Sequence, residues 1–196
     1  MNRRHPMGSS ETSGSGLVTS DWTRRPGGVM FEAPPPMKEI SVAPTFATAR
    51  RVDRDELIAF LRPRHRGVLA TTRRDGRPQL SPVSCGVDEA GRIVIATYPR
   101  RAKAGNARAN PLVSICVQSD DWSDAYVDVD GRAEVLDMPD ALDGLVEYFR
   151  SISGEHPDWA EYRDAMVRQD KSLLRITIDR WGPIATGGFP PELARS

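Results

Sequence analysis

The residues best suited to chemistry in this sequence lie in one basic segment, residues 98–111 (YPRRAKAGNARANP). The segment follows an apolar, strand-like run and has the composition of a short helix that its final Asn-Pro pair ends. Arg100, Arg101 and Lys103 then lie at the helix start, where unpaired backbone N–H groups and the positive end of the helix dipole favour an anion. Asn106 lies three residues after Lys103 and shares its face. We therefore expect Arg101, Lys103 and Asn106 to bind a phosphate, whereas a solvated basic helix is the simpler alternative.

The sequence offers little else for catalysis. It contains no GxSxG, HExxH or P-loop motif. His5, His65 and His156 are far apart, and each lies beside Pro or Arg in an expected loop, so none is expected to be catalytic. Carboxylates are plentiful but follow a surface-like helical pattern, which leaves no candidate acid–base pair. Cys85 and Cys116 lie in apolar runs without zinc-ligand spacing, so we expect no metal site and a reduced, cytoplasmic protein.

Composition excludes several classes of protein. The 196 residues include 27 Lys+Arg and 27 Asp+Glu, and a neutral chain has no general attraction to nucleic acid or anionic membranes. No apolar run approaches the roughly 18–20 residues that would span a bilayer, and we expect no secretory signal. Among the basic residues only Lys38, Lys103 and Lys171 are lysines, which makes a lysine in a patterned place informative.

Two regions of different character divide the chain. Residues 1–50 are rich in Gly, Ser, Thr and Pro and have too few clustered apolar residues to bury a face, so we expect a flexible arm. An arm that lies across a partner subunit through Trp22 or Phe31 is the alternative. Residues 51–196 are expected to form a single domain of ordinary size.

The folded region reads as one helix followed by many short strands. Asp53 and Glu56 have the spacing of a capping box, and Pro63 ends the first helix. The Asp75-Gly76 pair predicts a tight hairpin turn, and residues 125–129 and 132–136 are expected to pair across Asp130-Gly131 in the same way. The expected strands are residues 67–73, 79–87, 92–97, 112–118, 125–129, 132–136 and 173–178, with helices at 139–153 and 158–168. Six or more short strands, mostly joined by tight turns, predict a mainly β fold in which an antiparallel barrel carries peripheral helices.

The order and spacing of these features resemble the pyridoxamine 5'-phosphate oxidase-like split-barrel superfamily. Within it, the chain is most similar to the flavin/deazaflavin oxidoreductase branch that uses coenzyme F420. The resemblance covers roughly residues 53–181. It is carried by the strand 67–73, the turn Asp75-Gly76-Arg77-Pro78, the run Ser81-Pro82-Val83, the pair Arg101 and Lys103 with Asn106, and the pair Asp121-Trp122.

The resemblance implies a split antiparallel β-barrel of the FMN-binding type that forms a homodimer, with cofactor sites between the subunits. Arg101 and Lys103 would hold the cofactor phosphate, with Asn106 beside them. Trp122 would pack on the ring system from the other subunit or the groove edge, although without the family an ordinary core aromatic is the simpler reading. The residues that would line the ring and its ribityl chain are Ser81, Pro82, Val83, Ala96 and Thr97.

The same resemblance implies a coenzyme F420-dependent reductase that transfers a hydride between the deazaflavin and a small conjugated or quinone-like substrate. Such a cofactor carries the hydride itself, which explains why the catalytic residues are not identifiable. The alternatives are an FMN-dependent oxidase or reductase and a non-catalytic flavin-, deazaflavin- or haem-binding protein. The sequence does not choose a proton donor among solvent, Arg73, Tyr98 and Tyr126.

The choice between the two cofactors depends on how far the positive charge extends. An FMN phosphate needs one tight ring of Arg and Lys, whereas the deazaflavin carries a phosphodiester and a lactyl–glutamate tail that needs further cations. The arginines available for that tail are Arg73, Arg74, Arg77, Arg100 and Arg108. A nucleic-acid partner is not expected, because the basic helix is short and has no aromatic stacking platform.

Overall fold

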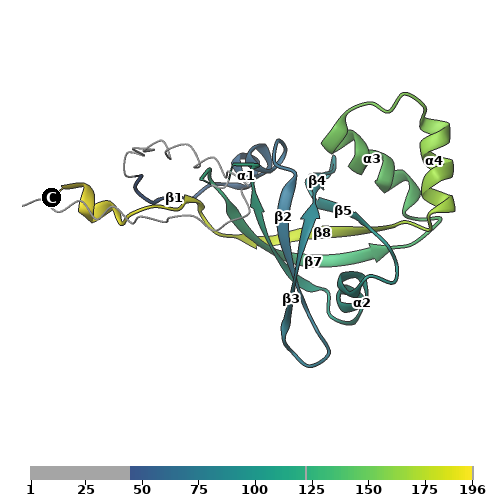
Figure 1. Cartoon of the computed structure of the whole chain (residues 1–196), viewed down its shortest axis with the longest axis horizontal. Coiled ribbons are helices and arrows are strands. Elements are labelled where there is room, and N and C mark those ends of the chain that lie inside the picture. The colour runs from purple at the N-terminus through teal and green to yellow at the C-terminus, as the bar shows by residue number, and fades with distance from the viewer. Residues whose placement is uncertain (1–44, 122, 196) are drawn as a thin grey trace, which may run out of the picture. The chain divides into compact units, whose positions relative to one another are not determined.

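A computed structural model describes residues 45–121 and 123–195 (Figure 1). Most of the arm expected over residues 1–50 lies outside these described residues. Its last residues form strand β1 (Thr48–Arg50), which pairs antiparallel with β9 (Ile184–Thr186) near the C-terminal end. The regular structure therefore begins a few residues before the expected boundary at residue 51. The signal was missed because a three-residue strand is too short to show alternation.

A seven-stranded antiparallel sheet with the order β3-β2-β6-β7-β8-β5-β4 forms the centre of the fold. The sheet curls, so that β3 approaches β5 although the two strands are not hydrogen-bonded neighbours (Figure 1). This is the predicted mainly β split-barrel architecture with few, peripheral helices. The strands are β2 (Arg66–Thr72), β3 (Pro78–Ser84), β4 (Gly86–Val87), β5 (Ile93–Thr97), β6 (Leu112–Gln118), β7 (Val127–Leu136) and β8 (Ser172–Trp181).

Alternating apolar residues build the core inside this curl. In β6, Val113, Ile115 and Val117 are buried while the residues between them are more exposed, as expected for a half-buried strand. Leu69 of β2 and Val129 of β7 contribute to the same cluster. The period-2 pattern in residues 112–118 therefore located β6 correctly.

The prediction of two strands that pair across Asp130-Gly131 is wrong. The structure has one continuous strand there, β7, with a register shift at Asp130/Gly131. A Cβ added to Gly131 would lie 2.3 Å from the backbone oxygen of Thr177. The glycine is therefore needed for the close approach of β8 and not for a turn, a difference that a local Asp-Gly pair does not reveal.

The predicted strand 79–87 is also interrupted. β3 ends at Ser84, and after Cys85 the chain continues as the short strand β4, which pairs with β5. The backbone N–H of Cys85 donates to the carbonyl of His65, so this break is held against the loop that leads into β2. The interruption moves the chain from one edge of the sheet to the other.

Four α-helices surround the sheet. Helix α1 (Arg54–Leu61) begins with the predicted capping box, in which Asp53 and Glu56 bond reciprocally. Helix α2 (Ala102–Ala109) follows β5. Helices α3 (Leu142–Ser153) and α4 (Trp159–Arg168) form a hairpin, with α3 next to β4, β5 and β8 (Figure 1). A 3-10 helix, η1 (Pro191–Arg195), ends the described chain. Over residues 45–121 and 123–195, no helix is long and apolar enough to span a membrane.

Candidate functional site

Helix α2 begins without a cap. Its N-cap residue, Arg101, has extended backbone and makes no side-chain hydrogen bond to the helix, and the first turn carries no acidic residue. The first N–H groups of a helix have no partner inside it, and basic residues at this end oppose the helix dipole. Ala104 and Ala107 are buried and hold the helix against the barrel. The helix start is therefore fixed in place and electrostatically prepared for an anion.

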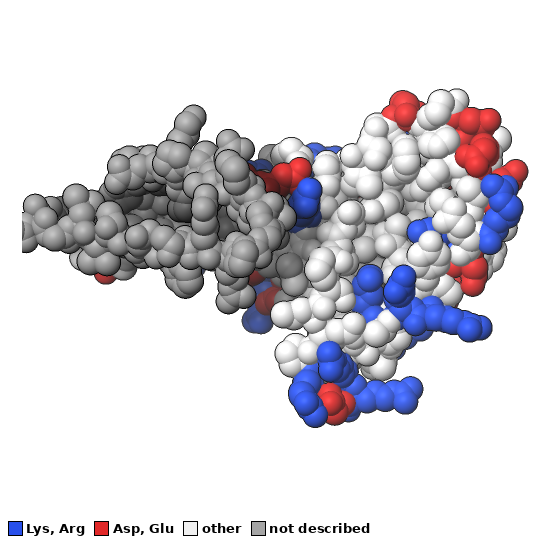
Figure 2. Space-filling model, viewed as in Figure 1, with Lys and Arg blue, Asp and Glu red and all other residues white. Residues whose placement is uncertain are grey.

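The cations near this helix start have no carboxylate partner. Figure 2 shows Lys and Arg side chains gathered over the β2–β3 hairpin and α2. Most other arginines of the described chain are paired, such as Arg77 with Asp75 at 3.1 Å and Arg108 with Asp137 at 2.7 Å. The residues that form no ion pair within the described chain and lie around α2 and the facing groove are Arg73, Arg74, Arg100, Arg101, Lys103 and Lys171.

Lys103 is the most constrained of these cations. Burial, and secondarily the positive charge of Arg101, lower the pKa of Lys103 below its ordinary value. A bound anion would oppose both effects, because it stabilises the charged ammonium group. The environment of Lys103 therefore favours a negatively charged ligand.

A groove of about 390 Å³, here called the central groove, lies between the edge of β3 and the α3–α4 hairpin. Lys103 lines it together with Pro82, Val83 and Ala96, so four of the predicted cofactor-binding residues come together here. Lys171 also lines the groove, and its Nζ lies 4.0 Å from the ring centre of Tyr98. The other residues that line the groove are Ser84, Tyr148, Phe149, Tyr162, Met166 and Gln169.

The helical wall of the central groove is neutral and held in place. Tyr148 donates a hydrogen bond to the carbonyl of Ser84 at 3.3 Å, and Tyr162 donates to the carbonyl of Leu145 at 3.0 Å. Burial raises the pKa of Tyr148 to about 12, so its phenol stays protonated. The Phe149 and Tyr162 rings contact each other with centroids 5.0 Å apart. Sequence reasoning missed this wall, because the acidic residues of both helices indicated only a solvated outer layer.

A second cavity of about 490 Å³, here called the basic pocket, lies between α2 and the end of the β2–β3 hairpin. Arg73, Arg74, Arg100 and Arg101 line it, and none of its lining residues is acidic. The first turn of α2 separates this pocket from the central groove, since Lys103 lines the groove and Arg101 lines the pocket. Positive charge therefore continues from one cavity to the next.

Asn106 lines the basic pocket, but its amide nitrogen is already occupied. Asn106 Nδ2 donates to Thr71 Oγ1 at 3.1 Å and to Gln79 Oε1 at 3.0 Å. These bonds attach α2 to β2 and β3. The Asn106 side chain thus leaves mainly its oxygen, an acceptor, for any ligand, which suits a positioning role better than direct contact with an anion.

Ala96 and Thr97 face opposite sides of β5, because neighbouring residues alternate along a strand. Ala96 lines the central groove, whereas Thr97 shares the buried face of Ile93 and Ile95. Thr97 is 3% exposed, and its Oγ1 has no hydrogen-bond partner within the described chain. A buried hydroxyl without a partner is costly, by about 1–3 kcal/mol. The end of β5 therefore carries an unsatisfied polar atom beside α2.

Two further predicted cofactor-binding residues are Ser81 and Trp122. Ser81 lies in β3 directly before the groove-lining residues Pro82, Val83 and Ser84, but does not line the central groove itself. Trp122 lies outside the described residues. The described cavity walls thus group Pro82, Val83, Ala96 and Lys103 in one groove and place Arg101 with Asn106 in the adjoining pocket.

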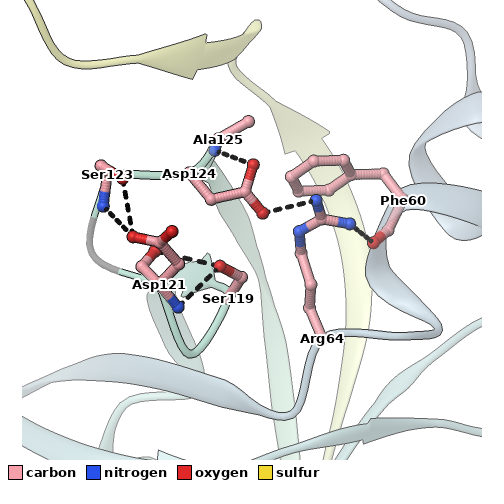
Figure 3. A network of polar contacts seen from close by, with 7 residues as sticks. All are labelled: Phe60, Arg64, Ser119, Asp121, Ser123, Asp124 and Ala125. Carbon is pink, nitrogen blue, oxygen red and sulfur yellow. Dashed lines mark hydrogen bonds and ion pairs between the residues drawn. The ribbon is translucent and has the colours of Figure 1, made fainter.

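The loop on either side of residue 122 is tied to α1 by a polar network (Figure 3). The Arg64 guanidinium lies 3.7 Å from the centroid of the Phe60 ring and donates to the Phe60 carbonyl at 3.0 Å. Its other terminal nitrogen bonds Asp124 Oδ2 at 3.1 Å. Asp121 accepts bonds from the backbone and hydroxyl of Ser123, which lower the pKa of Asp121. These contacts hold the residues on both sides of position 122 in place.

Comparison with known proteins identifies the family. A family model described as pyridoxamine 5'-phosphate oxidase matches residues 54–185. A conserved hypothetical protein from Mycobacterium tuberculosis is 26% identical, with a TM-score of 0.58 over 70% of this chain and 89% of that one.

Two further solved structures share the fold at lower identity. One is a putative 5-nitroimidazole antibiotic resistance protein from Bacteroides thetaiotaomicron, 15% identical, with a TM-score of 0.56 over 74% of this chain and 92% of that one. The other is a heme binding protein from Mycobacterium smegmatis, 20% identical, with a TM-score of 0.50 over 67% and 53%. The family model covers well over half of the sequence, and the chain therefore belongs to the pyridoxamine 5'-phosphate oxidase family.

Proposed function

We propose that this protein is a coenzyme F420-dependent reductase that moves a hydride from the reduced deazaflavin to a small conjugated or quinone-like substrate. The observation that carries the proposal is the continuous run of unpaired cations from the central groove into the basic pocket. A compact phosphate monoester would need only the first part of this run. A phosphodiester followed by an acidic tail would use both parts.

The residues around α2 fit the anionic part of such a cofactor. Lys103, Arg101 and the uncapped N–H groups of α2 would hold the phosphate, because charge-assisted hydrogen bonds to phosphate are the strongest available to side chains. Arg73 and Arg74 would hold the carboxylates of the tail in the basic pocket. Asn106 acts by fastening α2 to the barrel.

The central groove fits the planar part of the cofactor. Pro82 and Val83 would lie along one side of the ring, and Ala96 leaves space beside them. Pro82 donates no backbone hydrogen bond, so the ligand would not compete with a strand partner at that position. Phe149 and Tyr162 form an aromatic wall opposite, which excludes water from the reacting ring. When bound in its reduced form, the deazaflavin supplies the hydride.

An FMN-dependent oxidoreductase is the second candidate. Lys103 and Lys171 line one groove and would suffice for a phosphate monoester, but this arrangement leaves the basic pocket without a role. A haem carrier has less support, because no histidine or cysteine of the described residues lines the central groove, and the phenols of its two tyrosines are already bonded to backbone carbonyls. The charge of the basic pocket therefore favours the deazaflavin.

Cofactor titration tests the proposal. We expect the full chain, purified without cofactor, to quench F420 fluorescence with a dissociation constant in the micromolar range and to bind FMN more weakly. Reduced F420 bound to the protein should then be oxidised on addition of an enone or quinone acceptor. Tight binding of FMN without binding of F420 would contradict the proposal, and F420 binding without oxidation by any acceptor would indicate a carrier.

We also propose that the protein is a homodimer. The outer face of β2, β3 and β6 exposes Leu80 (66%) and Leu112 (53%), and a cavity of about 530 Å³ lies on the same face next to Ala70. Large exposed apolar residues on one sheet face are typical of an interface. Sedimentation velocity should give a dimer for the full chain and a monomer for Leu112→Asp.

A further inference from the structure

A third cavity shares part of its wall with the central groove. This cavity of about 820 Å³, here called the lateral groove, is lined by Pro82, Val83 and Ser84, the same β3 residues that line the central groove. Its other side is formed by the start of β2, the end of β6 and α3. A ligand along β3 in the central groove would therefore be adjacent to a second molecule in the lateral groove.

The two grooves differ in charge. Among the described residues, the charged side chains that line the lateral groove are Arg66 and Asp120, which form an ion pair with each other. The central groove instead carries Lys103 and Lys171, which have no carboxylate partner in the described part of the chain. Because the charges of the lateral groove cancel, it suits an uncharged occupant, whereas the central groove suits an anion.

His65 supplies the lateral groove with a titratable hydrogen-bonding group. Its Nδ1 lies 3.2 Å from the carbonyl oxygen of Cys85, and the Cys85 N–H donates back to the His65 carbonyl at 3.0 Å. Cys85 is buried, so the first bond orients the imidazole and the second holds the His65 backbone. If Nδ1–H donates to that carbonyl, Nε2 is the nitrogen left for a ligand, and it has no hydrogen-bond partner within the described chain.

The ionisable groups around His65 are either paired with an opposite charge or neutral. Arg64 is paired with Asp124, and Arg66 is paired with Asp120. Burial raises the pKa of the Cys85 thiol and of the Tyr148 phenol, each to about 12, so both are neutral. No carboxylate is paired with the imidazole within the described chain.

We propose that the lateral groove binds the hydride acceptor, an uncharged conjugated carbonyl compound, and that His65 protonates the acceptor oxygen. This inference rests on the function proposed above. The hydride adds to the carbon β to the carbonyl, and the C=C electron pair shifts to form an enolate. The His65 imidazolium transfers its Nε2 proton to the enolate oxygen and becomes neutral. The acceptor gains two electrons, the deazaflavin loses two, and the resulting enol converts to the ketone.

The walls of the lateral groove match this class of acceptor. Val68 and Ile152 provide apolar contacts for the carbon skeleton, and Gln118 provides a second polar group near the start of β2. Negative charge develops on the oxygen during hydride transfer, and a positioned acid lowers the barrier by contributing typically 10²–10⁴-fold in rate. The structure places one such acid, His65, in this groove.

Binding can be tested without cofactor. The chain has three histidines, so their Cε1–H signals are resolvable by two-dimensional NMR. We expect 2-cyclohexen-1-one to shift the signal that is missing in His65→Gln and to leave the signal of His156 unchanged. His156 is a matched control, because it also lies in a half-buried position but packs among the rings of α3 and α4. An unmoved His65 signal would overturn the inference.

Kinetics tests the chemical role. With F420 bound and reduced, kcat/KM for 2-cyclohexen-1-one should fall with rising pH in the wild-type protein, because the proposed step consumes an imidazolium proton. His65→Gln should bind F420 with unchanged affinity, react at least 100-fold more slowly and lose this pH dependence, while His156→Gln keeps the normal profile.

The two proposals fail in different ways. Absence of F420 binding or oxidation in the wild-type protein would contradict the proposed function and, with it, the acceptor role of the lateral groove. Normal F420 oxidation in His65→Gln, with the wild-type rate and pH profile, would contradict only the role of His65. If His65→Gln does not fold, His5→Gln and His156→Gln assign the other two histidine signals, and the NMR titration of the wild-type protein still tests binding at His65.

Discussion

Basic side chains occur in two different environments in this protein, one with a carboxylate partner and one without a carboxylate partner among the described residues. In the loop network of Figure 3, Arg64 is stacked on Phe60 and paired with Asp124, so its charge is neutralised inside the fold. Around the start of α2, Arg101 and Lys103 have no carboxylate partner among residues 45–121 and 123–195, although they lie close enough together for Arg101 to lower the pKa of Lys103. Paired cations stabilise the fold, whereas unpaired ones leave their field available to a ligand.

The β2–β3 hairpin shows the same contrast within a few residues. Arg77 pairs with Asp75, whereas Arg73 and Arg74 line the basic pocket without a partner. All three arginines are exposed, so burial does not explain the difference. The two arginines that line a cavity are the ones without an ion pair in the described chain, which leaves their charge available to a ligand there.

The largest effect is expected from Lys103→Ala. We expect this variant to bind F420 about 10–100-fold more weakly, which corresponds to the 1–3 kcal/mol of a lost charge-assisted hydrogen bond. Fluorescence titration measures the change. Arg108→Ala is the matched control on the same helix, because Arg108 is paired with Asp137, and its affinity should stay within about twofold. An equal loss of F420 affinity in both variants would contradict the prediction that only cations without a carboxylate partner bind the cofactor.

A smaller effect should separate the two cofactors. The double variant Arg73→Ala/Arg74→Ala removes charge from the basic pocket, and we expect its F420 affinity to fall about 3–10-fold, as exposed ion pairs contribute only up to about 1 kcal/mol each. Its affinity for FMN should not change. Arg77→Ala, in the same hairpin, should leave both affinities unaltered. A parallel loss for FMN would argue against an acidic tail in this pocket.

Substitutions in the ion-paired network of Arg64 should change the stability of the fold. Arg64→Ala removes the Phe60 contact and the Asp124 pair, and we expect the free energy of unfolding to fall by about 1 kcal/mol. Urea denaturation measures this value, and a double-mutant cycle with Asp124→Ala isolates the pair. Arg101→Ala should weaken F420 binding with no comparable loss of stability. A stability loss in Arg101→Ala as large as in Arg64→Ala would contradict the comparison.

The smallest effect concerns the free energy of unfolding, which the charge of Lys103 lowers when no anion is bound. Because its pKa is lowered in the folded protein, the folded state binds fewer protons than the unfolded state at alkaline pH. Cofactor-free wild-type protein should therefore gain stability as pH rises through the folded pKa of Lys103 toward the usual lysine value of about 10.4.

Lys103→Met should lack this alkaline gain. At neutral pH, the variant should be slightly more stable than the wild type, by less than about 1 kcal/mol, because the side chain is only partly buried. Urea denaturation at several pH values measures both effects. A less stable variant, or one with an unchanged pH dependence, would show that the charge at this position does not oppose folding.

Local sequence patterns were sufficient for much of the fold. The Asp53/Glu56 spacing specified a helix start, since both bonds of a capping box form within one turn. Alternation in residues 112–118 specified β6 with its bounds, and the basic segment specified a short helix with Lys103 in its first turn. Each of these features depends on residues that are neighbours in the chain.

Other features depended on contacts between distant residues. Gly131 read as a turn, but it is required by the passage of β8 beside β7. Lys171 and Phe149 had no local signal as groove residues, because they reach the central groove only when α3, α4 and β8 pack beside β3. The amide of Asn106 looked available for a ligand until folding brought Thr71 within reach.

By itself, the sequence determined that a mainly β barrel carries a basic helix start suited to an anion, because strand alternation, turns and helix polarity are local properties. Only the tertiary structure decided which cations stay free. Arg108 and Arg101 look equivalent in the basic segment, yet folding places Asp137 beside the first and no carboxylate beside the second. Electrostatic pairing depends on distance in space, and residues 29 positions apart in the chain are brought to 2.7 Å only by the packing of α2 against the end of β7.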